Sequence, residues 1–311
     1  MAASYFKQKG LLFLCPFCQE DLKLQEKSYI CPKGHTFDVA KSGYVNLLPQ
    51  LKQAPIYDKE SFQSRRQVFE AGLYGHILSK MEEVIAQNTL SGEVLRLLDS
   101  GCGEGYYARA LSIMTQHMPE DEQNKRNNRK ENENKLGAVD KICGEKAERE
   151  IWAFDISKAS VELAAKADRE KRVNWFVADI ARLPLKPKSF GGILSIYSLA
   201  NYKEFLRVLK PDGFVLKVIP GLDHLQELRA LVKGQLKNPE YSNQQIKDLF
   251  ATHLQSVEGI QVSQTFPLDE KTKEALVNMS PLLFQVKKED VDIDSLKEIT
   301  ISGEILLGKV W

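Results

Sequence analysis

The sequence lacks any long apolar run. The only apolar stretch near its start, residues 11–14, is far shorter than the ~18 residues that cross a bilayer and too short for the core of a signal peptide. We therefore expect a soluble, cytoplasmic protein with no membrane partner.

Cysteine is scarce and neither sign of charge dominates. The chain has 311 residues, five cysteines, 43 Lys/Arg and 42 Asp/Glu, for a net charge of +1. An odd cysteine count without a secretory signal argues against a disulfide framework and for metal binding or free thiols. A near-zero net charge leaves no global field to pull the chain onto nucleic acid. The apolar share, 43%, is enough for a large core.

The patterning predicts three regions: a module at 1–50, a helical linker at 51–90, and a larger domain at 91–311. The module is too small to fold by apolar burial alone. The linker shows helical spacing at 61–69 and 73–85. In the large domain, strands alternate with helices, which favours βαβ units and a parallel sheet. The predicted strands are 94–98, 151–154, 173–177, 192–196 and 214–219, and the predicted helices are 106–115, 159–170, 203–209 and 225–237.

The end of the chain has a different pattern. We expect a helix at 242–254, a strand at 260–266, and one or two strands at 299–310 that break near Gly303. This end could be antiparallel.

One segment does not fit the alternation. Residues 120–135 consist only of Asp, Glu, Asn, Gln, Lys and Arg, so they cannot join a core. We expect a disordered polar insertion at about 118–148, with a coil or a charged helical spur as the alternative.

Two pairs of metal-binding residue types lie in the first module. Cys15 and Cys18 are separated by two residues, and Cys31 and His35 by three, with twelve residues between the pairs. Three thiolates and one imidazole suit a tetrahedral Zn²⁺, and four protein ligands make such a site structural, with no position open for substrate. The alternative is three buried cysteines and an incidental histidine.

A glycine-rich loop follows the strand at 94–98. Asp99 is followed by Gly101, Gly103 and Gly105, with Glu104 between the last two, and a helix is predicted to begin near residue 106. A dinucleotide fingerprint would need glycine at 106, which is tyrosine here. A loop that brings backbone close to a ligand and sets two carboxylates beside it suits a cationic cofactor, and S-adenosylmethionine meets that description.

Two further acidic residues end the next two strands. Asp155 ends the strand at 151–154, where it could accept hydrogen bonds from ribose hydroxyls, and Asp179 follows 173–177, where it could face the adenine amine. Asp155 lies fifty residues beyond Gly105, instead of the usual ~20. The polar insertion and its flanks account for the extra length.

These residues resemble the bacterial 23S rRNA (guanine-N1)-methyltransferases, which carry a zinc module before the catalytic domain. The likeness spans nearly the whole chain, except for the insertion and a less distinctive C-terminal third. It rests on the quartet Cys15, Cys18, Cys31 and His35, the run YVNLLP at 44–49, Arg65-Arg66, Ala71-Gly72-x-Tyr74, the run GCGEGYY at 101–107, and Pro220-Gly221-x-x-His224-Leu225.

The resemblance implies methyl transfer from S-adenosylmethionine to N1 of one guanine in a 23S rRNA hairpin near the peptide exit tunnel. It implies a Rossmann-like class I methyltransferase, an α/β fold with a mixed seven-stranded sheet, beside a small zinc-binding β module that takes part in RNA recognition. By position, Tyr74, Gly103, Glu104 and His224 are implied as cofactor contacts. The partners expected are the rRNA hairpin and, as an option, a second copy of the chain.

Several roles stay open at this point. Arg65 and Arg66 suit phosphate contacts, but surface arginines are common. Tyr74 could pack a linker helix, and His224 could cap one. Tyr197 lies after the fourth strand and is a candidate for contacting the target base. The general base is unknown. The segment at 196–201 lacks the Asn/Asp-Pro-Pro-aromatic sequence of enzymes that methylate exocyclic amines, which favours a ring-nitrogen target.

Two other functions remain under consideration. A methyltransferase of a small molecule would share the cofactor motifs without needing zinc. A non-enzymatic zinc-containing RNA-binding protein would have no need of an intact glycine loop.

Overall fold

A computed structural model describes residues 12–48, 59–89, 94–114, 148–235, 242–283, 286 and 291–310. The insertion expected at 118–148 lies outside these residues, apart from Glu148. None of the helices in this described part has the length and apolar character needed to span a bilayer.

The described strands form two sheets. A small antiparallel sheet in the N-terminal module has the order β1-β2-β3, and an eight-stranded sheet has the order β10-β11-β9-β8-β5-β6-β7-β4. The strands are β1 (Lys23–Gln25), β2 (Ser28–Ile30), β3 (Thr36–Asp38), β4 (Tyr44–Asn46), β5 (Leu95–Ser100), β6 (Arg149–Asp155), β7 (Val173–Val177), β8 (Phe190–Ile196), β9 (Leu209–Pro220), β10 (Gln255–Pro267) and β11 (Glu298–Lys309).

The large sheet is mixed, as expected. Its strands from β4 through β9 pair in parallel, whereas β11 pairs antiparallel with both β9 and β10. The central strands β5, β6 and β8 are rich in apolar residues, which suits strands that are covered on both faces. The carboxyl ends of these parallel strands therefore meet at one edge, which is where ligands bind in open α/β sheets.

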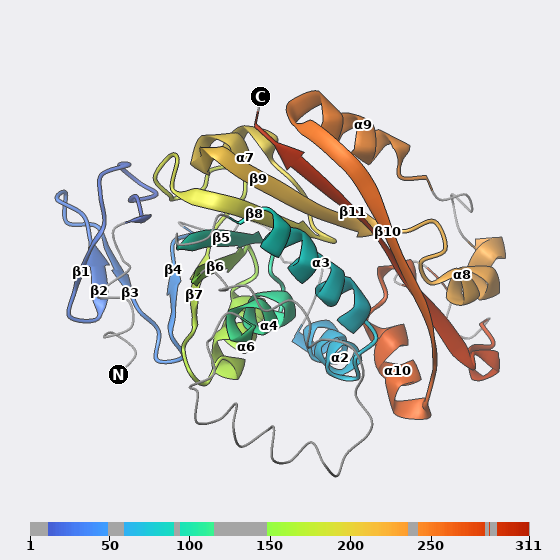
Figure 1. The fold of residues 1–311 in the computed structure, drawn as a ribbon. Coiled ribbons are helices and arrows are strands. Elements are labelled where there is room, and N and C mark those ends of the chain that lie inside the picture. Colours follow the sequence, from blue (N-terminus) through green and yellow to red (C-terminus); the bar gives the residue numbers. More distant parts are fainter. Residues whose placement is uncertain are drawn as a thin grey trace, which may run out of the picture.

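Helices cover both faces of this sheet (Figure 1). One core lies under α2, α3, α4, α6, α8 and α10, and the other lies under α7 and α9 together with the N-terminal module. The helices are α2 (Lys59–Glu70), α3 (Gly75–Gln87), α4 (Tyr106–Ile113), α6 (Lys158–Ala167), α7 (Tyr202–Val208), α8 (Gln226–Val232), α9 (Gln244–His253) and α10 (Glu270–Met279).

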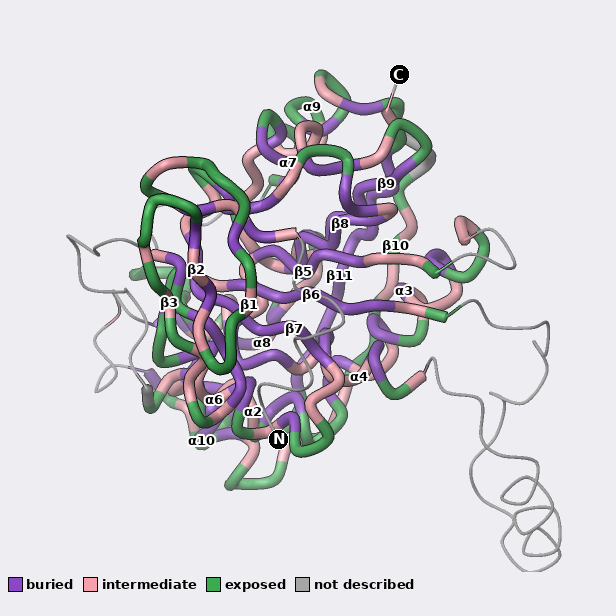
Figure 2. The backbone as a smooth tube through the Cα atoms, turned by 90° about the vertical axis from the view of Figure 1, so that its left-hand side faces the viewer, coloured by how far each residue is buried: buried purple, intermediate pink, exposed green. Residues whose placement is uncertain are grey.

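The N-terminal module is built into the large sheet. Strand β4 lies within the region expected to form the separate module, yet it pairs in parallel with β7, Tyr44 opposite Trp175. Phe13 is fully buried, with its ring centroid 5.0 Å from that of Trp152 and 5.2 Å from that of Phe176. Figure 2 shows the buried strands of the large sheet passing behind the loops of this module. The two regions therefore share one core.

The added strand β4 explains why the large sheet has eight strands and not the seven expected. Within the described chain, β5 to β11 are the seven strands expected of the catalytic domain, and β4 is the eighth. The antiparallel C-terminal end is confirmed.

One expectation was wrong, and one helix was missed. Strand β11 runs unbroken through Gly303, where a Cβ would meet the Tyr197 hydroxyl at 3.0 Å, so the glycine allows a close approach and does not end the strand. Helix α10 was not foreseen, although Asp269 gives it an N-cap by accepting a 2.7 Å hydrogen bond from the Thr272 amide.

Candidate functional site

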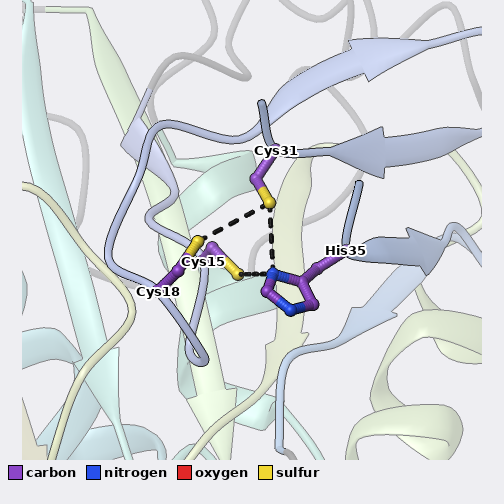
Figure 3. A group of neighbouring side chains, drawn as sticks. All are labelled: Cys15, Cys18, Cys31 and His35. Carbon is purple, nitrogen blue, oxygen red and sulfur yellow. Dashed lines mark hydrogen bonds between the residues drawn. The ribbon is translucent and has the colours of Figure 1, made fainter. Parts of the chain in front are cut away.

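The four expected metal ligands converge at one point. Their ligand atoms all lie within 4.8 Å of one another, as Figure 3 shows. His35 Nδ1 lies 3.4 Å from Cys15 Sγ and 3.3 Å from Cys31 Sγ, and the Sγ atoms of Cys18 and Cys31 are 3.6 Å apart. The edges of a tetrahedron around Zn²⁺ are about 3.5–3.8 Å, given Zn–S near 2.3 Å and Zn–N near 2.0 Å. The donor set therefore fits zinc.

Tight turns create this convergence. The Gln19 amide donates to the Cys15 carbonyl at 2.8 Å, and the Gly34 amide donates to the Cys31 carbonyl at 2.9 Å. Gly34 has φ +83°, a left-handed conformation that costs glycine little. Desolvation raises the pKa of the Cys31 thiol, but hydrogen bonds from the His35 backbone and other donors outweigh it and lower that pKa to about 6. A thiolate is the form that binds a metal.

The glycine loop forms the second site, at the carboxyl end of β5. Gly101, Gly103 and Gly105 all have positive φ, between +55° and +81°. The amides of Gly101 and Cys102 both donate to the Phe154 carbonyl at 2.9 Å, which holds the loop against the end of β6. These three positions were predicted from spacing, and the loop between strand and helix lies where a nucleoside-bearing ligand binds in such folds.

Asp99, Glu104 and Asp155 gather around this loop. Burial, together with the negative charges of Asp155 and Glu104, raises the pKa of Asp99 to about 7. Burial also raises the pKa of Asp155, although its carboxylate accepts hydrogen bonds from the Gly103 amide at 3.0 Å and the Ser157 amide at 2.8 Å. Such close carboxylates favour a positively charged ligand.

Glu104 is held by the start of α4. Its carboxylate accepts hydrogen bonds from the Tyr106 amide and from Arg109 Nη2, both at 3.2 Å. Burial raises its pKa, with Arg109 opposing that effect. Glu104 therefore fixes the helix that follows the loop.

Three aromatic side chains from separate segments of the chain pack against one another near these acids. Tyr74, at the N-cap of α3, is buried, and its ring centroid lies 5.9 Å from that of Tyr197 and 6.2 Å from that of His224. The rings of Tyr197 and His224 stack with centroids 5.7 Å apart. These three residues are far apart in the sequence, and the fold brings them together. Tyr74 and His224 were expected at one place, as cofactor contacts, whereas Tyr197 was expected only to contact the target base.

The tautomer of His224 follows from its hydrogen bond. Its Nδ1 lies 3.1 Å from the backbone nitrogen of Ser302, which is a donor, so Nδ1 accepts. Burial lowers the pKa of His224 to about 4, so the ring is neutral near pH 7 and Nε2 carries the proton. His224 therefore offers a donor, not a base.

Tyr107, on α4, lies near this cluster, although nothing in its sequence position singled it out. Its hydroxyl is buried and has no hydrogen-bond partner among the described residues. Burial raises the pKa of Tyr107 well above its usual value, with the charges of Tyr197, Tyr74, Tyr106 and Asp99 adding to the effect. An orphaned buried hydroxyl is costly. A polar ligand bound beside Tyr107 would satisfy this hydroxyl.

The remaining predicted residues lie at separate places. Nη1 of Arg65 is 3.4 Å from where a Cβ on Gly103 would stand, so this arginine lies over the cofactor loop. Arg66 forms an exposed ion pair with Glu70 at 2.7 Å. Asp179 follows β7 and accepts a 2.8 Å hydrogen bond from the Ala181 amide.

Comparison with known proteins adds an independent finding. Residues 13–54 match the family described as RlmA, N-terminal, a zinc ribbon, and residues 136–216 match a methyltransferase domain. YxjB of Bacillus subtilis (strain 168), which is named as a 23S rRNA (guanine-N(1)-)-methyltransferase, is 32% identical over 305 residues, 96% of each chain. The chain belongs to the 23S rRNA (guanine-N1)-methyltransferase family.

Further members of this methyltransferase family are more distant. The 23S rRNA (guanine(748)-N(1))-methyltransferase of Streptomyces fradiae is 24% identical over 93% of each chain. A relative from Micromonospora griseorubida, also named as a 23S rRNA (guanine-N(1)-)-methyltransferase, is 26% identical over 86% of this chain and 85% of its own. The methyltransferase fold, the zinc-binding module and S-adenosylmethionine as methyl donor are thereby confirmed.

Proposed function

We propose that this chain transfers a methyl group from S-adenosylmethionine to N1 of a guanine in 23S rRNA. The observation that carries the proposal is the joining of the two sites in one body. Strand β4, which leaves the zinc-bearing module, pairs with β7, and β7 pairs with β6, whose last residue is Asp155. A module bound to RNA would therefore hold the RNA at a fixed place relative to the cofactor loop.

The cofactor is bound, in this proposal, by the loop and its neighbours. The backbone of Gly101, Gly103 and Gly105 lets the ligand approach closely, and Asp99, Glu104, Asp155 and Asp179 supply the polar and negative groups. Tyr74 and His224 close the pocket from the linker helix and from the turn after β9. When bound, S-adenosylmethionine supplies an electrophilic methyl group on a positively charged sulfur.

The chain contributes mainly by positioning. Methyl transfer requires N1 of guanine in line with the bond that breaks, and correct orientation alone accounts for a large part of such rate enhancements. The edge that carries N1 is hidden in a base pair, so the target guanine must be unpaired or flipped out of its stack. Tyr197, whose ring stacks on His224, is the aromatic side chain we propose to contact this base.

The proton on guanine N1 must leave during the transfer. His224 does not accept it, because Nδ1 already accepts from Ser302 and Nε2 is protonated. We assign His224 a binding role. The acceptor is then a carboxylate or an oriented water molecule.

The two competing functions fit less well. A small-molecule methyltransferase would have no use for a metal-bound module built into the edge of its sheet. A non-enzymatic RNA-binding protein would not need three left-handed glycines, two buried carboxylates and a third that is half-buried at one loop.

Finer features also belong to the proposal. In this proposal the target is a hairpin near the peptide exit tunnel and the zinc module recognises RNA. Arg65, which lies over Gly103, and the neighbouring Arg66 contact the RNA that reaches the cofactor loop. We propose a cytoplasmic location, where ribosomes are found, and a homodimer as the assembly to test.

Reverse transcription tests the activity in cells. Methylation at N1 blocks the Watson–Crick edge, so the copying enzyme stalls at the modified guanine. Deleting the gene should remove one stall on 23S rRNA, and the wild-type gene, but not the Gly105→Ala variant, should restore it. Stalls that are unchanged by the deletion would refute the proposed activity.

A further inference from the structure

Lys217 is a buried lysine in the middle of β9. Its side chain lies on the sheet face whose neighbouring β9 residues, Val215 and Ile219, are fully or almost fully buried, and Lys217 itself is 5% exposed. Lysine is almost never buried to this degree unless it is paired. The position therefore calls for a physical reason.

No carboxylate of the described residues forms an ion pair with Lys217. Its Nζ instead donates to Ser195 Oγ at 3.1 Å and to the Ser198 carbonyl at 3.0 Å. Burial lowers the pKa of Lys217 to about 8, so the amine is still largely charged near neutral pH. By contrast, the other lysine that is buried among the described residues, Lys273 on α10, forms an ion pair with Glu270 at 2.9 Å. A buried ammonium that has only neutral partners costs stability and suggests a functional reason for its presence.

The hydrogen-bond partners of Lys217 connect it to the cofactor loop. Ser195 stands opposite Lys217 in the pairing of β8 with β9, and Ser198 belongs to the loop between β8 and α7. The Ser198 hydroxyl donates to the Ser100 carbonyl at 2.7 Å. A Cβ added to Gly101 would meet Ser198 Cβ at 2.8 Å. The loop at 197–201 is thus tied to Lys217 on one side and seated on the cofactor loop on the other.

The same loop holds Tyr197 in an unfavourable backbone conformation. Tyr197 has φ +49°, a left-handed geometry that is unfavourable for a non-glycine residue. Such a residue keeps this geometry only where its surroundings fix it. The Tyr197 amide donates to the Val218 carbonyl at 2.9 Å, and the carbonyl of the following residue, Ser198, accepts from the Lys217 ammonium. Both bonds tie the turn to β9.

We propose that Lys217 is a positioning residue that holds the loop at 197–201, and with it the ring of Tyr197, in place for the target guanine. The inference rests on the proposed function, because it assigns Lys217 a part in presenting the base. A charge-assisted hydrogen bond to a carbonyl is stronger than a neutral one, which explains a lysine here in place of a neutral donor. Lys217 does not touch cofactor or substrate in this account.

The activity test compares three forms of the full-length, zinc-loaded protein. Lys217→Met keeps the length of the side chain and removes the ammonium, and Lys273→Met removes the other buried ammonium as a matched control. We expect Lys217→Met to lower kcat on 23S rRNA by about tenfold or more, since small misplacements cost up to ~100-fold, with the Kd for S-adenosylmethionine within about threefold of wild type. Lys273→Met should keep the wild-type kcat.

An exchange of the two side chains provides a rescue. Because Ser195 and Lys217 are opposite each other, the double variant Ser195→Lys, Lys217→Ser returns an ammonium to the same place from the neighbouring strand. It should recover kcat relative to Lys217→Met. A double variant that binds cofactor normally but is as slow as Lys217→Met would count against the inference. If Lys217→Met fails to fold, the double variant is compared with wild type instead, and a low kcat then counts against the inference.

Hydrogen exchange at 197–201 separates this inference from the proposed function. Lys217→Met should exchange faster than wild type in this loop, and Lys273→Met should not. If wild type methylates rRNA and Lys217→Met equals it in kcat and in protection, the inference is wrong and the proposed function stands. If wild type methylates no rRNA, the proposed function fails and the exchange data alone decide whether Lys217 holds the loop.

Discussion

Trp175 lies directly beneath Gly105. A Cβ built on Gly105 would stand 2.4 Å from Cη2 of the indole and 2.7 Å from Cβ of Ala164. Trp175 is itself fully buried on β7, where it pairs with Tyr44 of β4. The glycine that ends the cofactor loop therefore packs on the strand that receives the N-terminal module, so the loop and the module share one support.

Gly105→Ala should disable the cofactor loop. The added methyl group overlaps the indole, and φ +81° is unfavourable for alanine, so we expect a destabilised loop and at least a tenfold weaker affinity for S-adenosylmethionine. Calorimetric titration measures the affinity. Gly75→Ala is the matched control, because a Cβ there meets nothing within 4 Å. A Gly105→Ala protein that binds with wild-type affinity would show that the close packing is unimportant.

Loss of zinc should destabilise the whole chain. Cys18→Ala removes one of the four ligands, so we expect loss of the bound metal, measured by elemental analysis. Because Phe13 packs on Trp152 and Phe176, unfolding of the module exposes the core of the large sheet. We predict one thermal transition at a lower Tm. Cys102→Ala, outside the cluster, should retain zinc, and an unchanged upper transition in Cys18→Ala would contradict the shared core.

Asp99 should make the cofactor-free protein less stable as pH rises. Burial and the nearby carboxylates raise its pKa to about 7, above the ~3.9 of an unfolded chain. The folded state therefore holds a proton that the unfolded state has lost, so stability falls between about pH 4 and pH 7 and the full penalty applies above pH 7.

Asp99→Asn should remove this pH dependence. At 1.36 kcal/mol per pKa unit, we expect a gain of about 2–4 kcal/mol in the free energy of unfolding at pH 8, together with weaker binding of the cationic cofactor. Denaturant titrations at pH 5 and pH 8 measure the gain, with the exposed Asp212→Asn as control. Parallel pH profiles for Asp99→Asn and wild type would show that Asp99 is ionised normally.

Tyr107→Phe should separate stability from binding. Removing a buried hydroxyl that lacks a partner among the described residues should leave the Tm of the cofactor-free protein unchanged or higher. If the hydroxyl binds the cofactor, affinity should fall by roughly 5–10-fold, the value of one hydrogen bond of about 1–1.5 kcal/mol. Tyr202→Phe, on the opposite face of the sheet, should change the affinity little. If Tyr107→Phe binds S-adenosylmethionine with unaltered affinity, the Tyr107 hydroxyl does not contact the cofactor.

Much of the fold could be predicted because its signals are local. The strands that became β5, β6, β7 and β8 are apolar runs of strand length, and their alternation with helices indicated the parallel sheet. The pairing of β4 with β7 could not be predicted, because it joins segments about 130 residues apart. Gly303 was misread since glycine in a strand signals either a break or a close approach, and only the neighbouring Tyr197 decides which.

The candidate site likewise has residues that the sequence reveals and residues that only the packing reveals. The zinc ligands and the glycine loop have fixed spacings, so the sequence alone reveals them. Arg65, Tyr107 and Lys217 carry no such signal, because their environment is set by how α2, α4 and β9 pack against other elements. Arg65 was expected on the RNA side, and only the packing of α2 shows it over Gly103.

Mass analysis of the rRNA product tests the central claim most directly. Purified, zinc-loaded protein is incubated with S-adenosylmethionine and with 23S rRNA taken from cells that lack the gene, and the nucleosides are then separated and weighed. The account predicts a gain of about one N1-methylguanosine per 23S rRNA molecule, absent when Gly105→Ala protein is used. Guanosines that keep their original mass throughout, with protein that binds the methyl donor, would contradict it.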